Sequence, residues 1–182
     1  MMAASLLIGK RVMLREVAWG DLEAREGWLA DPDVVRFLGF VDGRPGPNLE
    51  DRSGCNMEWT IALKETQEPV GIAQFGHMDP LGHQASLGLV IGRKDLWGQG
   101  LGRDTIDVLL GFGFGVLGLN RIYLTVEARH EKAIRLYERL GFRTEGRLRE
   151  ARFTSDGLQD VLVMAVLSDE WIEAAAGREE GR

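Results

Sequence analysis

The residues best suited to chemistry form one short segment: Trp97-Gly98-Gln99-Gly100-Leu101-Gly102-Arg103. Three glycines at every second position let the backbone approach a ligand closely. A helix that begins here presents unpaired N–H groups at the positive end of its dipole, which suits a phosphate group. Arg93, Lys94 and Arg103 flank the segment and are expected to add positive charge. The segment therefore predicts a site for a ligand that carries a diphosphate.

The spacing of these glycines argues against two common nucleotide motifs. Position 103 is arginine, so the pattern is Gly-x-Gly-x-Gly and not the Gly-x-Gly-x-x-Gly of dinucleotide-binding folds. No Gly-Lys-Ser or Gly-Lys-Thr follows, which excludes the phosphate loop of NTPases. Another diphosphate-bearing ligand, or simply a tight turn, remains.

A second segment, Val126–Phe142, contains an amphipathic helix expected over Glu131–Leu140. Its apolar face carries Ala133, Leu136, Tyr137 and Leu140. Gly141 fits the left-handed position that ends a helix. Tyr137 is therefore either a core aromatic residue or a phenol at the rim of a ligand site.

These segments must be held by a mixed sheet. Alternating apolar residues and turn signals predict seven strands, over Lys10–Glu16, Glu58–Lys64, Val70–His77, Ala85–Ile91, Arg121–Val126, Phe142–Phe153 and Leu158–Leu167. Helices are expected over Asp21–Trp28, Asp31–Leu38, Leu101–Gly118 and Glu131–Leu140. Strands that precede a β-α-β-α-β order indicate an α+β fold with helices on the sheet faces. Gly39–Asn56 is rich in turn formers, and is either a loop beside a binding site or a surface connection.

Together the two segments resemble the GNAT acetyltransferase superfamily. They match its Arg/Gln-x-x-Gly-x-Gly/Ala loop and its Val-x-x-x-Asn-x-x-Ala-x-x-x-Tyr-x-x-x-Gly-Phe helix. Leu14-Arg15-Glu16 and Asp31-Pro32-Asp33-Val34 also resemble the branch that acetylates the N-termini of ribosomal proteins (RimJ/RimL-like). The resemblance covers about Lys10 to Trp171. It implies an α+β (α/β layered) fold with a mixed, mostly antiparallel sheet of six to seven strands, helices on both faces and splayed central strands.

The chain is expected to form a single domain over residues 1–182, with a core of about 10–171 and a frayed tail over 172–182. The resemblance implies direct transfer of an acetyl group from acetyl-CoA to a primary amine, either a protein N-terminus or a small molecule. The implied cofactor-binding residues are Leu89, Val90, Ile91, Trp97, Gly98, Gln99, Gly100, Leu101, Gly102, Arg103, His130, Ala133 and Tyr137. Among these, the backbone N–H groups of Leu89 and Val90 are the implied oxyanion donors, and Tyr137 is the implied general acid.

Three positions depart from the family pattern. Trp97 stands where many members have arginine or glutamine, His130 replaces the usual asparagine, and Ser86 stands where relatives often carry a glutamate. The last of these leaves the general base unassigned. Its candidates are Glu58, His77, Asp79 and Glu127, or a water chain that ends on one of them.

The choice of acceptor is expected to depend on Leu22–Trp59. Trp28, Phe37, Phe40 and Trp59 can line that side or serve as core residues. The alternative to an enzyme is a catalytically silent module that binds acetyl-CoA as a sensor or partner, for which the missing glutamate is the support. Turnover of acetyl-CoA separates the two hypotheses.

Composition limits the remaining partners. The formal net charge is −6, from 22 Lys and Arg against 28 Asp and Glu, which argues against broad nucleic-acid binding. The most apolar stretch, Val108–Leu119, is too short for a membrane span. One cysteine, Cys55, suits a cytoplasmic location, and the scattered histidines predict no metal site. The chain can also form a homodimer through its C-terminal strands.

Overall fold

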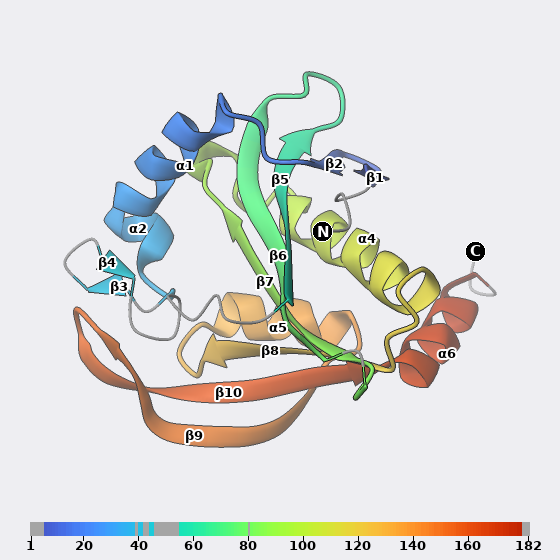
Figure 1. Cartoon of the computed structure of the whole chain (residues 1–182). Helices are drawn as coiled ribbons and strands as arrows, with labels where there is room; N and C mark the ends of the chain where they lie inside the picture. The colour runs from blue at the N-terminus through green and yellow to red at the C-terminus, as the bar shows by residue number, and fades with distance from the viewer. Residues whose placement is uncertain (1–5, 39, 42–43, 46–54, 80, 180–182) are drawn as a thin grey trace.

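The computed structural model describes residues 6–38, 40–41, 44–45, 55–79 and 81–179 (Figure 1). Most of the segment Gly39–Asn56 therefore lies outside the described residues. Within it, β3 (Phe40–Val41) and β4 (Arg44–Pro45) pair as a small antiparallel sheet of their own.

The main sheet has eight strands in the order β1-β2-β5-β6-β7-β8-β10-β9. Their bounds are Leu7–Ile8 (β1), Val12–Arg15 (β2), Cys55–Leu63 (β5), Pro69–Asp79 (β6), Gln84–Ile91 (β7), Arg121–Glu127 (β8), Arg143–Thr154 (β9) and Gly157–Leu167 (β10). Neighbours run antiparallel except for the parallel pair β7 and β8. The mixed, mostly antiparallel sheet is thus confirmed. The strand beyond the expected six or seven is β1, whose two residues are too few to show a periodic pattern.

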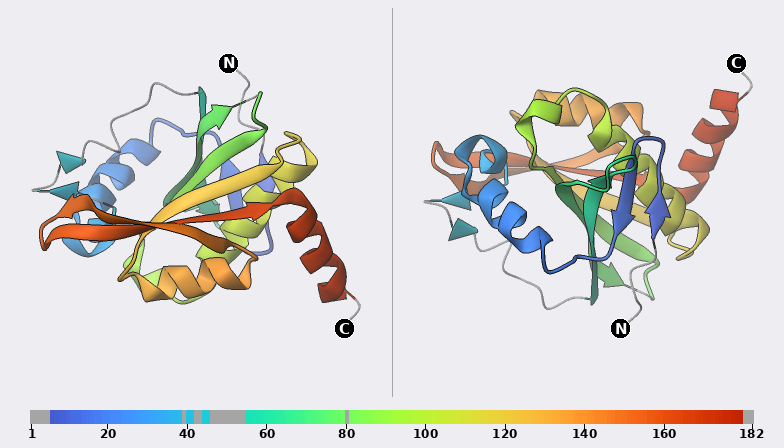
Figure 2. Two further views of the ribbon diagram at one scale, coloured as in Figure 1. Left: turned by 90° about the horizontal axis from the view of Figure 1, so that it is seen from below. Right: turned by 90° about the horizontal axis from the view of Figure 1, so that it is seen from above.

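The described helices are α1 (Asp21–Ala30), α2 (Pro32–Val35), the 3-10 turn η1 (Lys94–Leu96), α4 (Leu101–Gly115), α5 (Glu131–Arg139) and α6 (Ser168–Glu179). Helix α2 begins at a proline, which needs no N–H partner there. The Asp31 side chain caps it by accepting from the Asp33 N–H at 2.9 Å. In both views of Figure 2, α1 and α5 lie on opposite sides of strands β8 and β10, so helices cover both faces.

Helix α4 packs its apolar side on the sheet. Trp59, which is fully buried, meets Phe75 and Phe112 edge-on, with ring centroids 5.9 and 5.8 Å away. Gly113 sits closest to the strands, because a Cβ built there would lie 2.6 Å from the Ile122 Cδ1 atom. This close approach explains one of the glycines that helix propensity alone disfavours.

Helix α1 is tied to the opposite face of the sheet through a buried carboxylate. Asp21 accepts two hydrogen bonds from the Arg15 guanidinium, at 2.6 and 2.8 Å, and one from the Thr60 hydroxyl at 2.8 Å. The Arg15 guanidinium, with help from the Ala18 N–H, lowers the pKa of Asp21 to about 2. Farther along α1, Arg25 holds both oxygens of Glu58 on β5, at 2.5 and 3.2 Å.

The C-terminal segment is helical where a frayed tail was expected over residues 172–182. Helix α6 continues to Glu179, and residues 180–182 lie outside the described part of the chain. The Trp171 ring packs 5.6 Å from the Phe114 ring of α4. Glu170 pairs with Arg143 at 2.7 Å. These tertiary contacts, which local composition does not reveal, hold the start of the helix.

Candidate functional site

Strands β7 and β8 part from each other within the sheet (Figure 1). Their register contains only Gln84↔Arg121, Ala85↔Ile122 and Ser86↔Tyr123. Beyond Ser86, β7 continues to Ile91 without pairing with β8. The splayed central strands that the sequence predicted are therefore present, and the edge of β7 from residue 87 onward is open toward β8.

Two sets of backbone contacts fix which residues face that open edge. The His83 carbonyl accepts from the Asn120 N–H at 2.7 Å, so His83 directs its backbone groups toward β8. The Gly92 N–H donates to the Val70 carbonyl at 2.8 Å, so Gly92 directs its backbone toward β6. Since backbone groups alternate sides along a strand, odd-numbered residues of β7 face β8 and even-numbered residues face β6.

By this alternation, the backbone groups of Leu87, Leu89 and Ile91 point toward β8, and the N–H groups of Leu89 and Ile91 lie on the open part of the edge. The Val90 backbone lies in the ladder with β6, and its carbonyl is close enough that a Cβ on Gly71 would approach it to 2.2 Å. The structure therefore corrects the expectation that Val90 offers an N–H beside Leu89. The alternation of hydrogen bonds in the sheet allows only one of two neighbouring residues to face the gap.

Trp97 closes the far end of this edge. Its indole N–H donates to the Ile91 carbonyl at 2.8 Å, while the side chain remains 46% exposed. The contact fastens the glycine-rich segment to β7 and occupies the carbonyl expected to pair with a ligand. Trp97 therefore contributes to the site in two ways: it engages the Ile91 carbonyl, and it presents an exposed side chain of its own.

The glycine-rich segment has the geometry its sequence predicts. Gly98 and Gly100 have φ of 77° and 84°, in the left-handed region that favours glycine. Gly100 directly precedes α4, and no side chain caps that helix. A Cβ built at either glycine would meet nothing within 4 Å. The first N–H groups of α4, which have no partners within the helix, therefore face open space.

The neighbouring residues hold the segment in place. Gln99 donates its side-chain amide to the Asp95 carbonyl at 3.0 Å, and its own carbonyl accepts from the Arg11 guanidinium. Leu101 is only 2% exposed. A Cβ at Gly102 would lie 3.8 Å from side-chain atoms of both Leu89 and Leu136, so this turn packs where β7 meets α5.

The cationic side chains near the segment are mostly engaged with carboxylates. Arg93 and Lys94 each contact two of them, at distances of 2.6 to 2.9 Å: Glu68 and Asp95 for Arg93, and Asp31 and Asp33 for Lys94. Arg103 lies 3.8 Å from Asp107 and is more than half exposed. The expectation of free positive charge is therefore corrected for Arg93 and Lys94. The ion pairs of Lys94 tie η1 to the start of α2, and those of Arg93 reach Glu68, next to β6, and Asp95 of η1. Backbone N–H groups and Arg103 remain as the donors to an anion.

Helix α5 begins beside this region. His130, at its N-cap, stacks on the Phe37 ring at a centroid distance of 4.0 Å and an interplanar angle of 17°. Burial, and the nearby charge of Lys132, lower the pKa of His130, so its neutral form is favoured. Ala133 lies one turn later and packs against the core.

Tyr137 lies farther along the same helix face. Its ring centroid is 5.7 Å from that of Phe142, and burial raises the pKa of its phenol to about 12. The phenol is therefore protonated at neutral pH.

Two of the four general-base candidates, Glu58 and Asp79, are occupied elsewhere, whereas Glu127 has one paired oxygen and one buried oxygen without a hydrogen-bond partner. Glu58 is held by Arg25. Asp79 accepts from the Leu81 and Gly82 N–H groups at 3.0 and 2.9 Å, contacts that lower its pKa and make it a turn residue.

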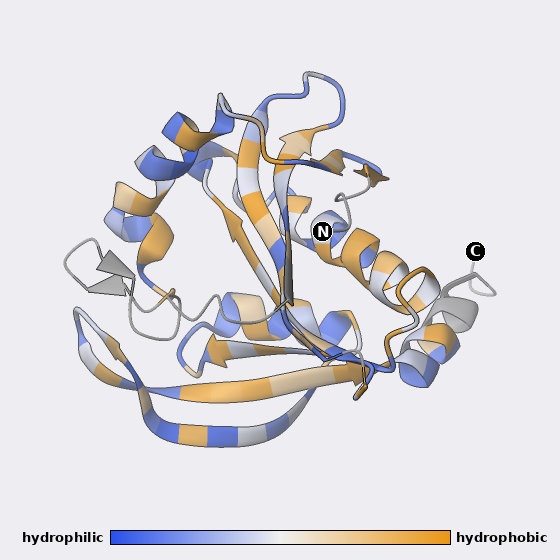
Figure 3. Cartoon of the chain, viewed as in Figure 1, coloured by the Kyte–Doolittle hydropathy of each residue, from blue (hydrophilic) through white to orange (hydrophobic). Residues whose placement is uncertain are grey.

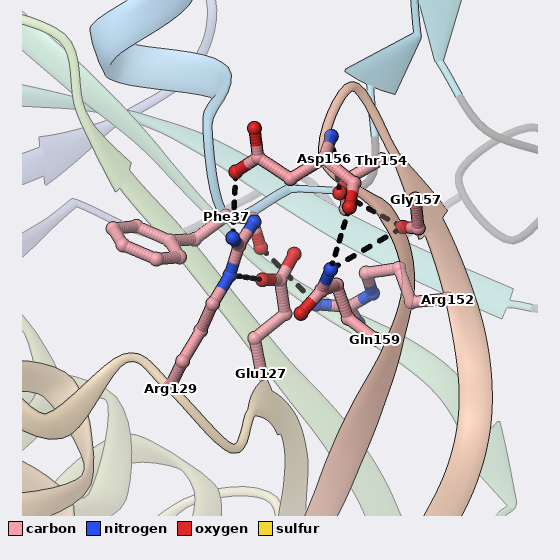
Figure 4. A network of polar contacts seen from close by, with 8 residues as sticks. All are labelled: Phe37, Glu127, Arg129, Arg152, Thr154, Asp156, Gly157 and Gln159. Atoms are coloured by element: carbon pink, nitrogen blue, oxygen red, sulfur yellow. Dashed lines mark hydrogen bonds and ion pairs between the residues drawn. The ribbon is translucent and has the colours of Figure 1, made fainter.

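Glu127 belongs to a partly buried network of charged residues that the sequence pattern did not predict (Figure 4). Its carboxylate, which is fully buried, accepts from Arg129 at 2.9 Å, and Arg129 also reaches Asp156 at 2.6 Å in the β9–β10 turn. Arg152 donates to the Phe37 carbonyl at 3.1 Å. The network joins the ends of α2, β8 and the hairpin. In the sequence, this network is indicated only by Glu127, a charged residue at the end of an apolar strand.

His77, the fourth candidate for the general base, lies beside Ser86 of β7. Its Nδ1 atom lies 3.3 Å from the Ser86 hydroxyl oxygen. Its backbone has φ of 46°, beside an irregularity in the register between Gly76 and Asp79. The structure thus brings His77 to the point where β7 and β8 begin to part.

The aromatic residues expected on the acceptor side have separate roles. Trp59 is a core residue, the second of the two roles that the sequence left open for it. Trp28 covers Gly92 so closely that a Cβ there would lie 2.1 Å from the indole. Phe37 stacks on His130. The side chain of Phe40 lies outside the described residues.

Among the described residues, no group of three or more His, Cys, Asp or Glu side chains is placed to hold a metal ion. No described helix combines the length and apolar character needed to cross a membrane.

Comparisons with known proteins agree with this geometry. A family model for the acetyltransferase (GNAT) domain matches residues 11–143. The chain is 29% identical over 174 residues to "Uncharacterized N-acetyltransferase p20" of Bacillus licheniformis, covering 91% of this chain and 97% of that one. It is 30% identical over 118 residues to spermidine N(1)-acetyltransferase of Vibrio cholerae, covering 64% and 68%. The solved structure of a "putative acetyltransferase" from T. thermophilus superposes with a TM-score of 0.79 at 30% identity, covering 99% and 98%.

Proposed function

Because the chain belongs to the GNAT acetyltransferase family, we propose that this N-acetyltransferase moves an acetyl group directly from acetyl-CoA to a primary amine. The observation that carries the proposal is the parting of β7 and β8 next to the uncapped start of α4. An unpaired strand edge accepts an amide-containing chain, and a helix N-terminus accepts a diphosphate. CoA contains both groups.

The residues present fit acetyl-CoA. The open edge from Leu87 to Ile91 is about 13 Å long at the rise of a strand. Its N–H groups suit the pantetheine arm, with Leu89 at the centre. The open space at Gly98 and Gly100 lets the diphosphate reach the amides of α4. His130, Ala133 and Tyr137 then lie along the arm from the α5 side.

Acetyl-CoA supplies the acetyl group as a thioester, and the chain orients and activates the reaction. The acceptor nitrogen forms a bond to the thioester carbon, and the carbon–sulfur bond breaks. The Leu89 N–H donates to the oxygen on which negative charge develops. The Tyr137 phenol gives its proton to the departing sulfur, for which its raised pKa keeps it in the protonated form.

Two acceptor classes have support. The Leu14-Arg15-Glu16 and Asp31-Pro32-Asp33-Val34 motifs favour protein N-termini, through their resemblance to the ribosomal-protein branch. The similarity to spermidine N(1)-acetyltransferase favours a polyamine. Residues 22–59 are the place where selectivity between them is expected to lie.

The same proposal extends to the organisation of the protein. Residues 1–182 form one acetyltransferase domain, and the cytoplasm, which holds acetyl-CoA and keeps a lone cysteine reduced, is its location. A homodimer would use β9, which ends the sheet. This strand is mostly hydrophilic next to the more apolar β10 (Figure 3), but exposes Leu148 and Phe153.

The test is release of free CoA from acetyl-CoA in the presence of N-terminal peptides, polyamines, aminoglycosides or amino acids. Turnover with one class establishes the activity and the acceptor type. Binding of acetyl-CoA without turnover in any class would contradict the proposed activity and favour the sensor function. Absence of acetyl-CoA binding would contradict the site itself.

A further inference from the structure

The point where β7 and β8 part is where the acyl group is expected to lie. The diphosphate site at Gly98–Arg103 is adjacent to the Ile91 end of β7. A pantetheine arm that runs along the open edge from there reaches the Leu89 N–H, the proposed oxyanion donor, before β7 and β8 join. Its thioester end therefore lies on the part of the edge that begins directly after Ser86, the last residue of β7 that still pairs with β8.

Ser86 presents its side chain to the face of the sheet that α1 covers. A Cβ at Gly88, two residues along, would lie 3.2 Å from the Gln74 side chain, and Gln74 pairs with Glu58. Glu58 is held by Arg25 of α1. Residues two apart in a strand share a face, so Ser86 lies on this polar face. Leu89 instead contacts the α4 and α5 side, where Tyr137 is found.

His77 reaches Ser86 because its backbone leaves regular strand geometry. A φ of 46° is uncommon outside glycine and asparagine, and such outliers concentrate at functional sites. His77 is exposed, and its imidazole places Nδ1 3.3 Å from the Ser86 oxygen. Imidazole is the side chain whose charge changes between pH 5 and 8.

Building on the proposed function, we propose that the His77–Ser86 pair removes the proton that an ammonium acceptor must lose before attack. The ammonium gives one proton to the Ser86 hydroxyl, which passes its own proton to His77 Nδ1. The neutral amine then forms the new carbon–nitrogen bond. The second proton on that nitrogen replaces the one that Tyr137 gives to the sulfur, and His77 releases its proton to solvent through the exposed ring.

The test compares two histidines that share a backbone conformation. His83 has φ of 48° and is also exposed, but its ring faces the Gly118 carbonyl. Asparagine tolerates this conformation, so His77→Asn and His83→Asn are matched variants. We expect kcat to fall about 100-fold in His77→Asn, as for loss of a general base, and to stay within twofold in His83→Asn. Ser86→Ala is expected to follow His77→Asn, and Ser86→Thr to keep most of the activity.

A second readout separates proton transfer from a structural effect. An acceptor amine that is already neutral at the assay pH needs no base before attack, so with it the defect of His77→Asn is expected to shrink to within about fivefold. Acetyl-CoA affinity is expected to be unchanged in both histidine variants. Equal losses with protonated and neutral amines, or full activity in His77→Asn, would overturn the assignment while leaving the proposed function intact. A wild-type chain that acetylates no amine would overturn both.

Discussion

The Tyr137 hydroxyl holds its proton strongly, because burial raises its pKa to about 12. Phe142 fixes the ring without using its polar end. Removing only the hydroxyl, in Tyr137→Phe, is expected to lower kcat about 100-fold and to change the Kd of acetyl-CoA by less than twofold, because the ring keeps its packing. Steady-state kinetics and calorimetric titration measure the two quantities.

The second tyrosine of the chain provides the control. Tyr123 lies on β8, where Arg121 packs over its ring at 4.9 Å. Tyr123→Phe removes the same atom and is expected to keep kcat within twofold. An unchanged kcat in Tyr137→Phe would remove this phenol from the mechanism.

Gly100 carries the second prediction at the scale of a residue. With φ of 84°, an added Cβ costs about 1 kcal/mol in backbone energy and projects into the open space before α4. If the amides there hold the diphosphate, Gly100→Ala is expected to raise the Kd of acetyl-CoA about tenfold in calorimetric titration. A Kd equal to that of wild type, in a folded variant, would contradict this location of the phosphate site.

At the scale of elements, the sequence predicted the helices and strands whose apolar residues follow a regular period. Alternation located seven strands, the order of elements predicted a mixed sheet, and the resemblance to the GNAT family implied the splayed central strands. The sequence pattern missed β1, which has two residues, and α6, which Trp171 holds by a tertiary contact. Likewise the motif located the glycine-rich turn before α4, but could not show that Arg93 and Lys94 are bound to carboxylates distant in the sequence.

The same limit applies to the direction in which the backbone groups of β7 point and to the network around Glu127. Nothing in Leu89-Val90 tells which N–H faces the open edge, because that depends on the hydrogen bonds with β6. Glu127, Arg129 and Asp156 come together only when β8 meets the β9–β10 turn. Side-chain type and spacing predict candidates, whereas pairing across elements decides which of them are free to act.

Helix α4 gives a paired prediction about its glycines. Gly111 has open space at its Cβ position, whereas a Cβ at Gly113 would meet Ile122 at 2.6 Å and Phe75 at 3.2 Å. Gly111→Ala is therefore expected to raise the free energy of unfolding by about 0.5–1 kcal/mol through helix propensity. Gly113→Ala is expected to lower it by about 1–2 kcal/mol through overpacking. Urea unfolding of both variants measures the difference, and the same sign for both would contradict this account of the packing.

At the scale of the whole molecule, acidic groups outnumber basic ones, and many of them are placed where the fold uses their charge. Asp21 joins β2, α1 and β5, Asp31 joins α2 to the end of β7, and Asp160 holds Arg147 on β9. The surroundings of all three lower their pKa. Acid is therefore expected to unfold the protein by protonating carboxylates that the native state keeps charged.

The contribution of Asp21 to this acid sensitivity can be measured separately from that of the other carboxylates. Its pKa is about 2 in the folded protein, against 3.8 in the unfolded chain, so the folded state favours the charged form. Ionised Asp21 therefore stabilises the folded state, by at most about 2 kcal/mol. This contribution is complete above about pH 5 and is lost as the pH falls toward 2. Asp21→Asn removes the titrating group but keeps an oxygen that can accept from Arg15 and Thr60.

Other carboxylates titrate in both proteins, so the difference between wild type and Asp21→Asn reports Asp21 alone. Denaturant unfolding at each pH from 7 to 3 measures it. We expect the wild-type advantage to be constant between pH 7 and 5 and to fall to about half by pH 3. An advantage that stays constant down to pH 3 would mean that the pKa of Asp21 is the same in both states. The junction of β2, α1 and β5 would then depend on the shape of this side chain and not on its charge.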